Sequence, residues 1–329
     1  CLNQMKLLTY KIDKLEVNQI GVLQDGIVYN LNNYFGDISL VDLIQIENYK
    51  DKVASFTFNK DCLKHDFEDL QVLPTIPKPN SFRDAYAFRQ HVETSRKNRG
   101  LEMIPEFDEF PVFYFSNHNA MFGDGQEIKL MSDHFEQLDY ELEFAIVIGK
   151  GGKNILTKEA ENHIAGFCIL NDLSARSLQM EEMKLNLGPA KGKDFANIIG
   201  PYLVTPDELE PRSIDTPNGK KYDLKMSCYV NGELLSEGNA KDMNWTFAEI
   251  IERASYGVEL YPGDVIGSGT VGTGCLLELN GTGKRNKSEY KERWIKENDE
   301  IEMQIDGLGK ITNKIVKSDS NHSIIKLKK

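Results

Sequence analysis

The sequence predicts a mainly β fold with some α-helix, in which a small β-rich N-terminal domain precedes a larger domain. Short apolar runs alternate with polar residues, Asp-Gly and Asn-Gly pairs mark hairpin turns, and prolines interrupt the pattern after residue 73. A chain of 329 residues has room for one large and one small core. We therefore expect an N-terminal domain at 1–73, a linker at 74–81 and a second domain at 82–329.

The composition excludes several classes of partner. The net charge is −12 and no basic cluster is present, so neither nucleic acid nor an anionic membrane is an expected partner. No apolar run is long enough to span a bilayer, and no apolar signal core opens the chain, so we expect a cytoplasmic protein. The five cysteines are widely spaced without a CxxC pair, which argues against both a zinc site and a disulfide framework.

The N-terminal region alternates as strands do over residues 5–35, with Asp25-Gly26 as a predicted hairpin turn. Residues 41–53 are predicted to form a short helix. Prolines at 74, 77 and 79 cannot continue regular structure, so they predict the linker.

The segment 82–100 predicts a partly buried helix that ends at Gly100. Asp84 and His91 stand seven residues apart, so on a helix they would share a face, about 10 Å apart along the axis. Taken alone, His91 is more often an ordinary surface histidine than a functional one. The stretch 105–123 is rich in aromatic residues, which could line a pocket or fill the core.

The stretch 139–201 carries the strongest functional pattern. Glu141 and Glu143 stand two apart in a predicted strand, so their carboxylates project from one face while apolar neighbours pack behind. Two like charges this close repel each other unless a cation lies between them. The polar residues that follow are Asp172, Arg176, Gln179 and Lys193. Three carboxylates with oxygen ligands suit Mg²⁺ or Ca²⁺ better than zinc, whereas a solvated strand face would explain only the glutamate pair.

Beyond Pro201 the pattern is β, with one clear helix at 244–257 and Asn231-Gly232 as a second hairpin turn. The glycines between 263 and 274 suggest backbone that approaches a ligand or forms a tight turn. No GK[ST] follows them, so this segment is not a phosphate loop. The tail at 301–316 alternates again and is predicted to be an edge hairpin.

Together these pieces resemble the fumarylacetoacetate hydrolase family over about residues 80–318. The resemblance rests on five motifs in order: DYELEFA at 139–145, NDLSARSLQ at 171–179, GPAKGKDF at 188–195, GDVIGSGT at 263–270 and IDGLGKITN at 305–313. It implies a β-roll catalytic domain around a metal site, preceded by a small domain, and a homodimer.

The resemblance also implies roles for individual residues. The implied metal ligands are Asp84, Glu141, Glu143 and Asp172, with Mg²⁺ or Ca²⁺ as the metal and Mn²⁺ as an alternative. The implied catalytic residues are His91 as general base, Glu278 in the predicted strand CLLEL as its partner, and Arg176, Gln179 and Lys193, which bind substrate oxygens. Further substrate contacts are implied for Tyr86, Tyr114, Gly269 and Thr270. Thr94 stands where short acylpyruvate hydrolases carry a glutamate, which favours the pairing of His91 with Glu278.

The implied activity is metal-dependent hydrolysis of a carbon–carbon bond in a 1,3-dicarbonyl of fumarylacetoacetate or acylpyruvate type. It would proceed through a metal-bound enolate and a water activated by His91. Relatives use the same site for hydration, decarboxylation, isomerisation or dehydration of 2-oxo acids, and these alternatives stay open, as does a non-catalytic binding protein. The expected partner is a small anionic dicarbonyl or 2-oxo acid.

Overall fold

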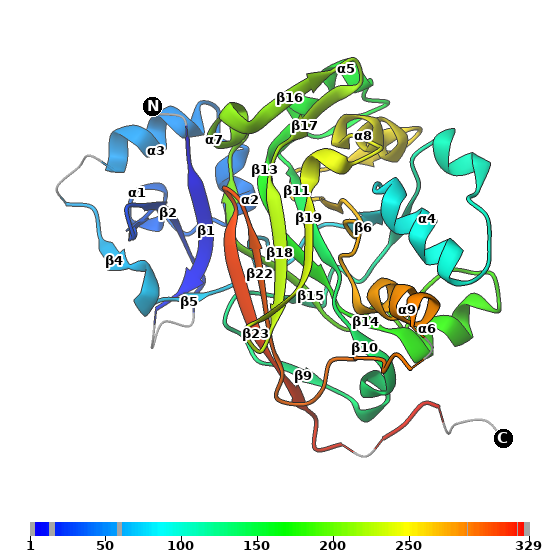
Figure 1. Ribbon diagram of the computed structural model, residues 1–329. Helices are drawn as coiled ribbons and strands as arrows, with labels where there is room; N and C mark the ends of the chain where they lie inside the picture. The colour runs from blue at the N-terminus through cyan, green and yellow to red at the C-terminus, as the bar shows by residue number, and fades with distance from the viewer. Residues whose placement is uncertain (1–3, 13–16, 58–60, 288, 321, 326–329) are drawn as a thin grey trace.

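Two β-sheets pack face to face and enclose the main hydrophobic core (Figure 1). The structure is a computed structural model that describes residues 4–12, 17–57, 61–287, 289–320 and 322–325. Contacts between β11 and β18, β13 and β22, and β15 and β23 join the two sheets. The predicted class, mainly β with some α, is therefore confirmed.

The larger sheet runs in the order β4-β3-β2-β1-β15-β13-β11-β21-β6-β7, with β5 beside β1 and β8 beside β15. Its strands are β1 (Lys6–Lys11), β2 (Gln19–Gln24), β3 (Ile27–Asn30), β4 (Lys64–Asp66), β5 (Gln71–Val72), β6 (Phe82–Ala85), β7 (Phe113–Phe115), β8 (Met121–Phe122), β11 (Leu142–Ile148), β13 (Ile164–Asp172), β15 (Asn197–Val204) and β21 (Val265–Gly267). Most neighbours are antiparallel, but β21 and β6 are parallel, which brings two distant segments of the chain together.

The second sheet runs in the order β19-β18-β22-β23-β9. Its strands are β9 (Ile128–Leu130), β18 (Lys225–Val230), β19 (Glu233–Asn239), β22 (Glu300–Ile305) and β23 (Gly309–Lys317). Three two-stranded pairs complete the β structure: β10 (Leu138–Asp139) with β14 (Ser174–Ala175), β12 (Gly152–Lys153) with β20 (Glu259–Leu260), and β16 (Ser213–Thr216) with β17 (Gly219–Tyr222).

Short helices cover the ends of the sheets. The α-helices are α1 (Asn32–Phe35), α2 (Leu40–Ile44), α3 (Tyr49–Thr57), α4 (Arg89–Asn98), α5 (Thr157–Ala160), α6 (Arg176–Met183), α7 (Pro206–Leu209), α8 (Phe247–Ser255) and α9 (Leu276–Asn286). The 3-10 helices are η1 (Phe67–Asp69), η2 (Pro105–Asp108), η3 (Ser132–Gln137), η4 (Glu161–His163), η5 (Glu210–Arg212) and η6 (Ala240–Asp242). In Figure 1, α4, α6 and α9 lie on the side of the molecule away from the N-terminal strands.

The side chains of β11 alternate between the two faces of the larger sheet. Phe144 and Ile146 face the core between the sheets, whereas Ala145 and Val147 face a second core shared with the N-terminal strands. Glu143 shares the face of Ala145, because side chains two residues apart in a strand project to the same side. The predicted placement of the apolar residues behind the glutamates is therefore confirmed.

The N-terminal strands continue the larger sheet instead of forming a separate one. Strand β1 pairs antiparallel with β15, and Leu7 lies opposite Leu203. The core beneath these strands also includes Ala145, Val147 and Val265 from the larger part of the chain. The boundary at 74–81 stays a prediction.

Both predicted hairpin turns are confirmed. The backbone φ angle is positive at Asp25 and Gly26 between β2 and β3, and at Asn231 and Gly232 between β18 and β19. Two successive positive φ angles match the twist of the flanking strands, and Asn, Asp and Gly tolerate them best. The tail also forms a hairpin, β22 with β23, but it is not an edge because β9 pairs with β23.

The predicted helix over 82–100 is wrong in its first half. Residues Phe82–Ala85 form β6, held between β21 and β7, and the helix begins only at Arg89. Asp84 and His91 therefore lie on different elements and do not share a helix face. Backbone pairing with strands far away in the sequence overrode the local pattern, which is common for short apolar runs.

Two further predictions on secondary structure need correction. The CLLEL segment is not a strand, because α9 begins at Leu276 and carries Glu278 in its first turn. The carboxylate of Asp139 accepts hydrogen bonds from the backbone N–H groups of Leu276 and Leu277, at 2.7 and 2.9 Å, and so caps the helix from a distant strand. The single helix predicted over 41–53 is instead two helices, α2 and α3.

The cysteines described by the structure, Cys62, Cys168, Cys228 and Cys275, are free and buried, and Cys1 lies outside the described residues.

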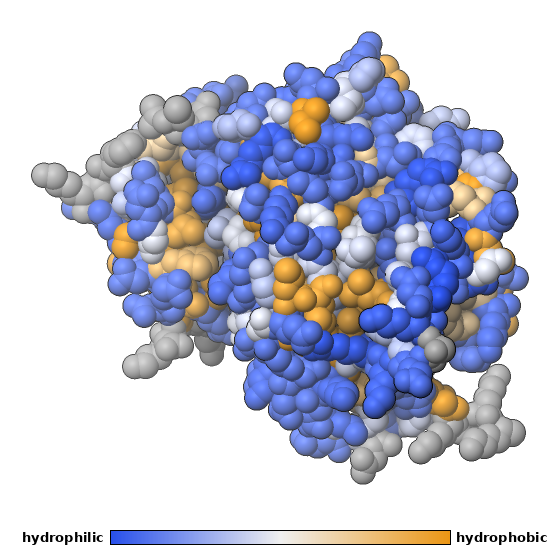
Figure 2. Space-filling view, in the orientation of Figure 1, coloured by the Kyte–Doolittle hydropathy of each residue, from blue (hydrophilic) through white to orange (hydrophobic). Residues whose placement is uncertain are grey.

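Among the described helices none is both long and apolar enough to cross a bilayer. The face of the molecule seen in Figure 2 is mostly hydrophilic, with apolar residues gathered in small groups.

We predict that Phe144→Ala lowers the free energy of unfolding by about 3–5 kcal/mol, because it leaves a cavity where the sheets pack. Phe144 is fully buried, and its ring meets that of Phe247 edge-on with centroids 5.0 Å apart. Urea denaturation followed by circular dichroism measures the change. Tyr256→Ala is the control, since that side chain is 83% exposed and should shift stability by less than about 0.5 kcal/mol. Equal stability of the two variants would contradict the prediction.

Candidate active site

Four carboxylates from three strand segments converge on one point. Asp84 comes from β6, Glu143 from the start of β11, Glu141 from the residue just before β11, and Asp172 from the end of β13. Each offers an oxygen, and these oxygens all lie within 4.8 Å of one another. The order β13-β11-β21-β6 places the three strands close together, with Asp84 opposite Gly267 of β21. The residues predicted as metal ligands therefore lie together in the structure.

Two buried cations neutralise only part of this cluster. Lys193 Nζ contacts Asp172 Oδ2 at 2.9 Å and also donates to Glu141. Arg176 Nη2 donates to Glu141 Oε1 at 2.8 Å, and its Nε donates to Asp139 Oδ2 at 2.9 Å. Asp139 is fully buried, so it adds a further carboxylate to the cluster. Within the described part of the site, carboxylates therefore outnumber cations.

The ionisation of the carboxylates follows this uneven distribution of cations. Burial and the neighbouring Asp172 raise the pKa of Asp84 to about 8. Burial and Asp84 raise the pKa of Glu143 well above its usual range. Burial alone would also raise the pKa of Glu141, but Lys193 and Arg176 lower it to about 2. Asp84 and Glu143 therefore hold their protons more readily than Glu141 does, because no buried cation in the described part of the site is ion-paired with either of them.

The glycine-rich segment after β21 fits closely against these two carboxylates. The backbone N–H of Gly269 donates to Glu143 Oε2 at 3.0 Å and to Asp84 Oδ1 at 3.2 Å. Gly269 has φ +78°, and a Cβ atom there would lie 2.4 Å from the carbonyl oxygen of Ala85. This position requires glycine, since a side chain would push the segment away from the carboxylates.

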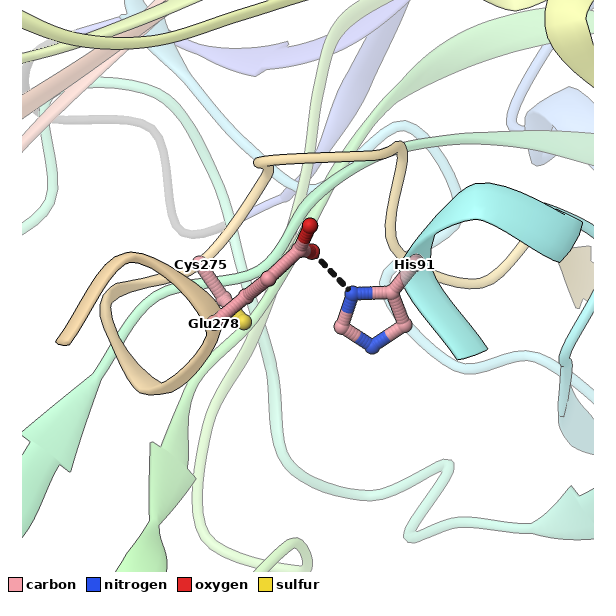
Figure 3. Close-up of side chains that lie close together, drawn as sticks. All are labelled: His91, Cys275 and Glu278. Atoms are coloured by element: carbon pink, nitrogen blue, oxygen red, sulfur yellow. Dashed lines mark hydrogen bonds and ion pairs between the residues drawn. The ribbon is translucent and has the colours of Figure 1, made fainter. Parts of the chain in front are cut away.

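His91 and Glu278 form a buried hydrogen-bonded pair beside the cluster (Figure 3). His91 lies in the first turn of α4 and Glu278 in the first turn of α9, two helices that pack together. His91 Nδ1 lies 2.6 Å from Glu278 Oε2, and Figure 3 shows the other ring nitrogen turned away from the carboxylate. The ring of Tyr86 meets the imidazole edge-on, with centroids 5.9 Å apart. The imidazole is therefore held in one orientation.

A cavity of about 490 Å³ opens over these groups. The predicted site residues on its wall are Asp84, Tyr86, His91, Tyr114, Glu141, Arg176, Gln179, Lys193, Gly269 and Thr270. Its apolar wall includes Val112, Phe113, Met180, Met183, Leu277 and Trp294. Glu143, Asp172 and Glu278 lie behind the wall, where they contact residues that line it.

Asp139 is a residue of this site that the sequence patterns did not single out. It binds Arg176 and caps α9, so it joins the cation of the carboxylate cluster to the helix that carries Glu278. The sequence does contain a pattern that includes it, because Asp139, Glu141 and Glu143 are acidic residues spaced two apart. The cap itself could not be predicted, since Asp139 and Leu276 are 137 residues apart.

The residues present fit a divalent metal ion. Asp172 Oδ1 is buried and has no hydrogen-bond partner among the described residues, so an acceptor is left for a cation. The donors are carboxylate oxygens, which hard divalent ions prefer. A divalent cation would also take the place of the protons that Asp84 and Glu143 hold.

Residues 80–316 match the family model of the fumarylacetoacetate (FAA) hydrolase C-terminal domain. Oxaloacetate tautomerase YisK of Bacillus subtilis is 31% identical over 269 residues, which cover 80% of this chain and 77% of that protein. An uncharacterized protein of Staphylococcus aureus strain USA300 is 28% identical over 332 residues, covering 95% of this chain and 100% of its own length.

Solved structures share the fold. The fumarylacetoacetate hydrolase of Exiguobacterium antarcticum has a TM-score of 0.70 at 23% identity and covers 95% of this chain and 100% of its own. The maleylpyruvate hydrolase of Sphingobium sp. SYK-6, solved with manganese(II) and pyruvate, has a TM-score of 0.70 at 18% identity and covers 96% of this chain and 100% of its own.

The family match spans most of the chain, and the carboxylate cluster and the fold agree with it. The chain belongs to the fumarylacetoacetate hydrolase family.

Proposed function

We propose that this protein is a metal-dependent hydrolase that cleaves a carbon–carbon bond in a 1,3-dicarbonyl substrate of acylpyruvate or fumarylacetoacetate type. The observation that carries the proposal is the buried His91–Glu278 pair, which lies on the same cavity as the carboxylate cluster. This arrangement supplies a base for water beside a site for a cation.

Asp84, Glu141, Glu143 and Asp172 would hold the metal, which we propose to be Mg²⁺, Mn²⁺ or Ca²⁺. The maleylpyruvate hydrolase of Sphingobium sp. SYK-6 forms a complex with manganese(II), and all three ions favour carboxylate oxygens. When bound, such an ion polarises substrate oxygens and stabilises the negative charge that develops on them.

His91 would remove a proton from the attacking water. A hydrogen bond from Nδ1 to the carboxylate of Glu278 leaves the lone pair on the other ring nitrogen available. Glu278 then stabilises the imidazolium formed during the reaction. The hydroxide adds to the acyl carbon, the carbon–carbon bond breaks with its electron pair on the departing carbon, and His91 returns the proton to that carbon.

Lys193, Arg176 and Gln179 would stabilise the oxygen that becomes negative. Lys193 and Arg176 are buried cations on the cavity wall. Gln179 accepts a hydrogen bond from Arg176 Nη1 through its carbonyl oxygen, at 2.9 Å. Its amide nitrogen, with no hydrogen-bond partner among the described residues, can therefore donate to substrate. Donors fixed in this way act on developing charge without reorganising.

The size and the walls of the cavity favour a substrate with an apolar portion. A four-carbon diacid would fill only part of about 490 Å³ and would leave Val112, Phe113 and Trp294 uncontacted. An acyl chain longer than that of oxaloacetate would cover this apolar wall, and burial of apolar surface favours binding.

A second candidate activity is keto–enol tautomerisation of oxaloacetate. The similarity to the Bacillus subtilis tautomerase favours it, and the same histidine could move a proton between carbon and solvent. Rates of pyruvate release from a series of acylpyruvates, compared with enol loss from oxaloacetate, test both candidates. We expect acylpyruvate cleavage to rise with chain length; tautomerisation without any cleavage would replace the hydrolase proposal.

The homodimer and the cytoplasmic location stay predictions from the sequence.

We predict that Glu143→Ala abolishes binding of Mn²⁺, because it removes one of the four converging carboxylates without removing the partner of a buried cation. Isothermal titration calorimetry measures the affinity. Glu181→Ala is the control, since that carboxylate is exposed and pairs with Lys184 at the surface. Undiminished Mn²⁺ affinity in Glu143→Ala would remove Glu143 from the proposed ligands.

We predict that His91→Ala lowers kcat for acylpyruvate cleavage by about 10²–10⁴-fold, the usual contribution of a positioned base. Glu278→Gln should lower kcat with little change in KM, because Glu278 acts on charge that appears in the transition state. Steady-state kinetics on the metal-loaded protein measures both.

His118→Ala serves as the control for the histidine change, since His118 is not on the cavity wall. It should cleave acylpyruvates at the parental rate. Cleavage by His91→Ala at the parental rate would mean that another group activates the water.

A further inference from the structure

Cys275 lies beside the His91–Glu278 pair and has no part in the proposed reaction (Figure 3). Its sulfur, a ring nitrogen of His91 and a carboxylate oxygen of Glu278 all lie within 4.8 Å of one another. The three side chains are buried, with exposed fractions of 0%, 7% and 1%. One sulfur, one nitrogen and one oxygen donor therefore converge here, whereas the neighbouring cluster offers carboxylate oxygens.

Two of these donors are not committed elsewhere. Cys275 is a free thiol, and within the described part of the chain its sulfur has no hydrogen-bond partner. Glu278 Oε1 is buried and likewise lacks a partner there, while Oε2 binds His91. A buried carboxylate oxygen without a donor is costly, so the carboxylate of Glu278 retains capacity to accept from a cation.

We propose that His91, Cys275 and Glu278 form a second metal site, selective for zinc or a similar borderline-soft ion. Zinc takes cysteine, histidine and carboxylate ligands together, often three from the protein with a fourth position left for water. The wide spacing of the cysteines argued against a zinc site, but only one cysteine is needed here. The packing of α4 against α9 brings His91 to it, and Glu278 lies three residues further along in the first turn of α9.

The hydrogen bond between His91 and Glu278 must open for the site to accept the ion. Tetrahedral zinc with bonds near 2.1 Å would place the ligating nitrogen and oxygen about 3.4 Å apart. His91 Nδ1 and Glu278 Oε2 are now 2.6 Å apart, so they must separate slightly as the ion replaces the proton between them. All three ligands lie at the start of a helix, so side-chain rotation can supply this change without moving the helix axes.

Binding would release one proton to solvent, the thiol proton of Cys275, and the ring proton of His91 would move from Nδ1 to the other ring nitrogen. The proposed general base and its partner would then both be held by the metal. Zinc would thus inhibit the enzyme even when Mg²⁺ saturates the carboxylate cluster, because Mg²⁺ does not compete for a thiolate ligand. The inhibition rests on the proposed function, whereas the binding does not.

Cobalt(II) tests the binding, because a cysteine thiolate bound to it gives a charge-transfer band in the near ultraviolet. Added to protein saturated with Mg²⁺, one equivalent should produce the band in the parent and in Cys168→Ala, which removes an equally buried thiol in β13. Cys275→Ala and Cys275→Ser should lack it. No band in the parent, or a band in Cys275→Ala, would overturn the site and leave the proposed function untouched.

Zinc titration of the cleavage rate in excess Mg²⁺ tests the consequence. We expect zinc to inhibit the parent and Cys168→Ala alike, and the zinc concentration for half inhibition to rise by about tenfold or more in Cys275→Ala. The uninhibited rate of Cys275→Ala should match the parent, since Cys275 is not proposed to touch substrate. A cobalt band that depends on Cys275, without zinc inhibition, would overturn the inhibitory role and count against His91 as the base.

Discussion

The burial of several carboxylates at one end of a β-sheet is the constraint on which the rest of the site depends. Buried like charges repel strongly, so such a group persists only with cations or protons to offset it. Arg176 and Lys193 supply two fixed positive charges, both directed at Glu141. Asp84 and Glu143 have no such partner among the described residues, and the raised pKa of each reflects this. Without a cation these two carboxyl groups hold protons, and a divalent ion would take the place of those protons.

Asp139 connects the carboxylate cluster to the helix that carries Glu278. Its carboxylate binds Arg176 and also accepts from the backbone at the start of α9, where the helix dipole favours a negative charge. Helix α9 carries Glu278 in its first turn, and Glu278 orients His91 on α4. The carboxylate cluster and His91 are therefore linked through a short series of buried polar contacts, which fixes the position of the imidazole relative to the cluster.

Proteins of similar fold carry different activities. The fold neighbours include hydrolases and isomerases, and the Bacillus subtilis relative is a tautomerase. The outer cavity wall, with residues such as Val112 and Trp294, is placed to contact the part of a substrate that does not react.

Local patterns in the sequence determined the elements that depend on neighbouring residues. The hairpins at Asp25-Gly26 and Asn231-Gly232 follow from residues that tolerate positive φ, and the shared face of Glu141 and Glu143 follows from the period of a strand. The tertiary structure decided the rest. Residues 82–85 became a strand because β21 and β7 pair with them, and residues after Cys275 became a helix because Asp139 caps it from 137 residues away. Neither partner is visible in a local window, since hydrogen bonds between distant segments form only when the chain folds.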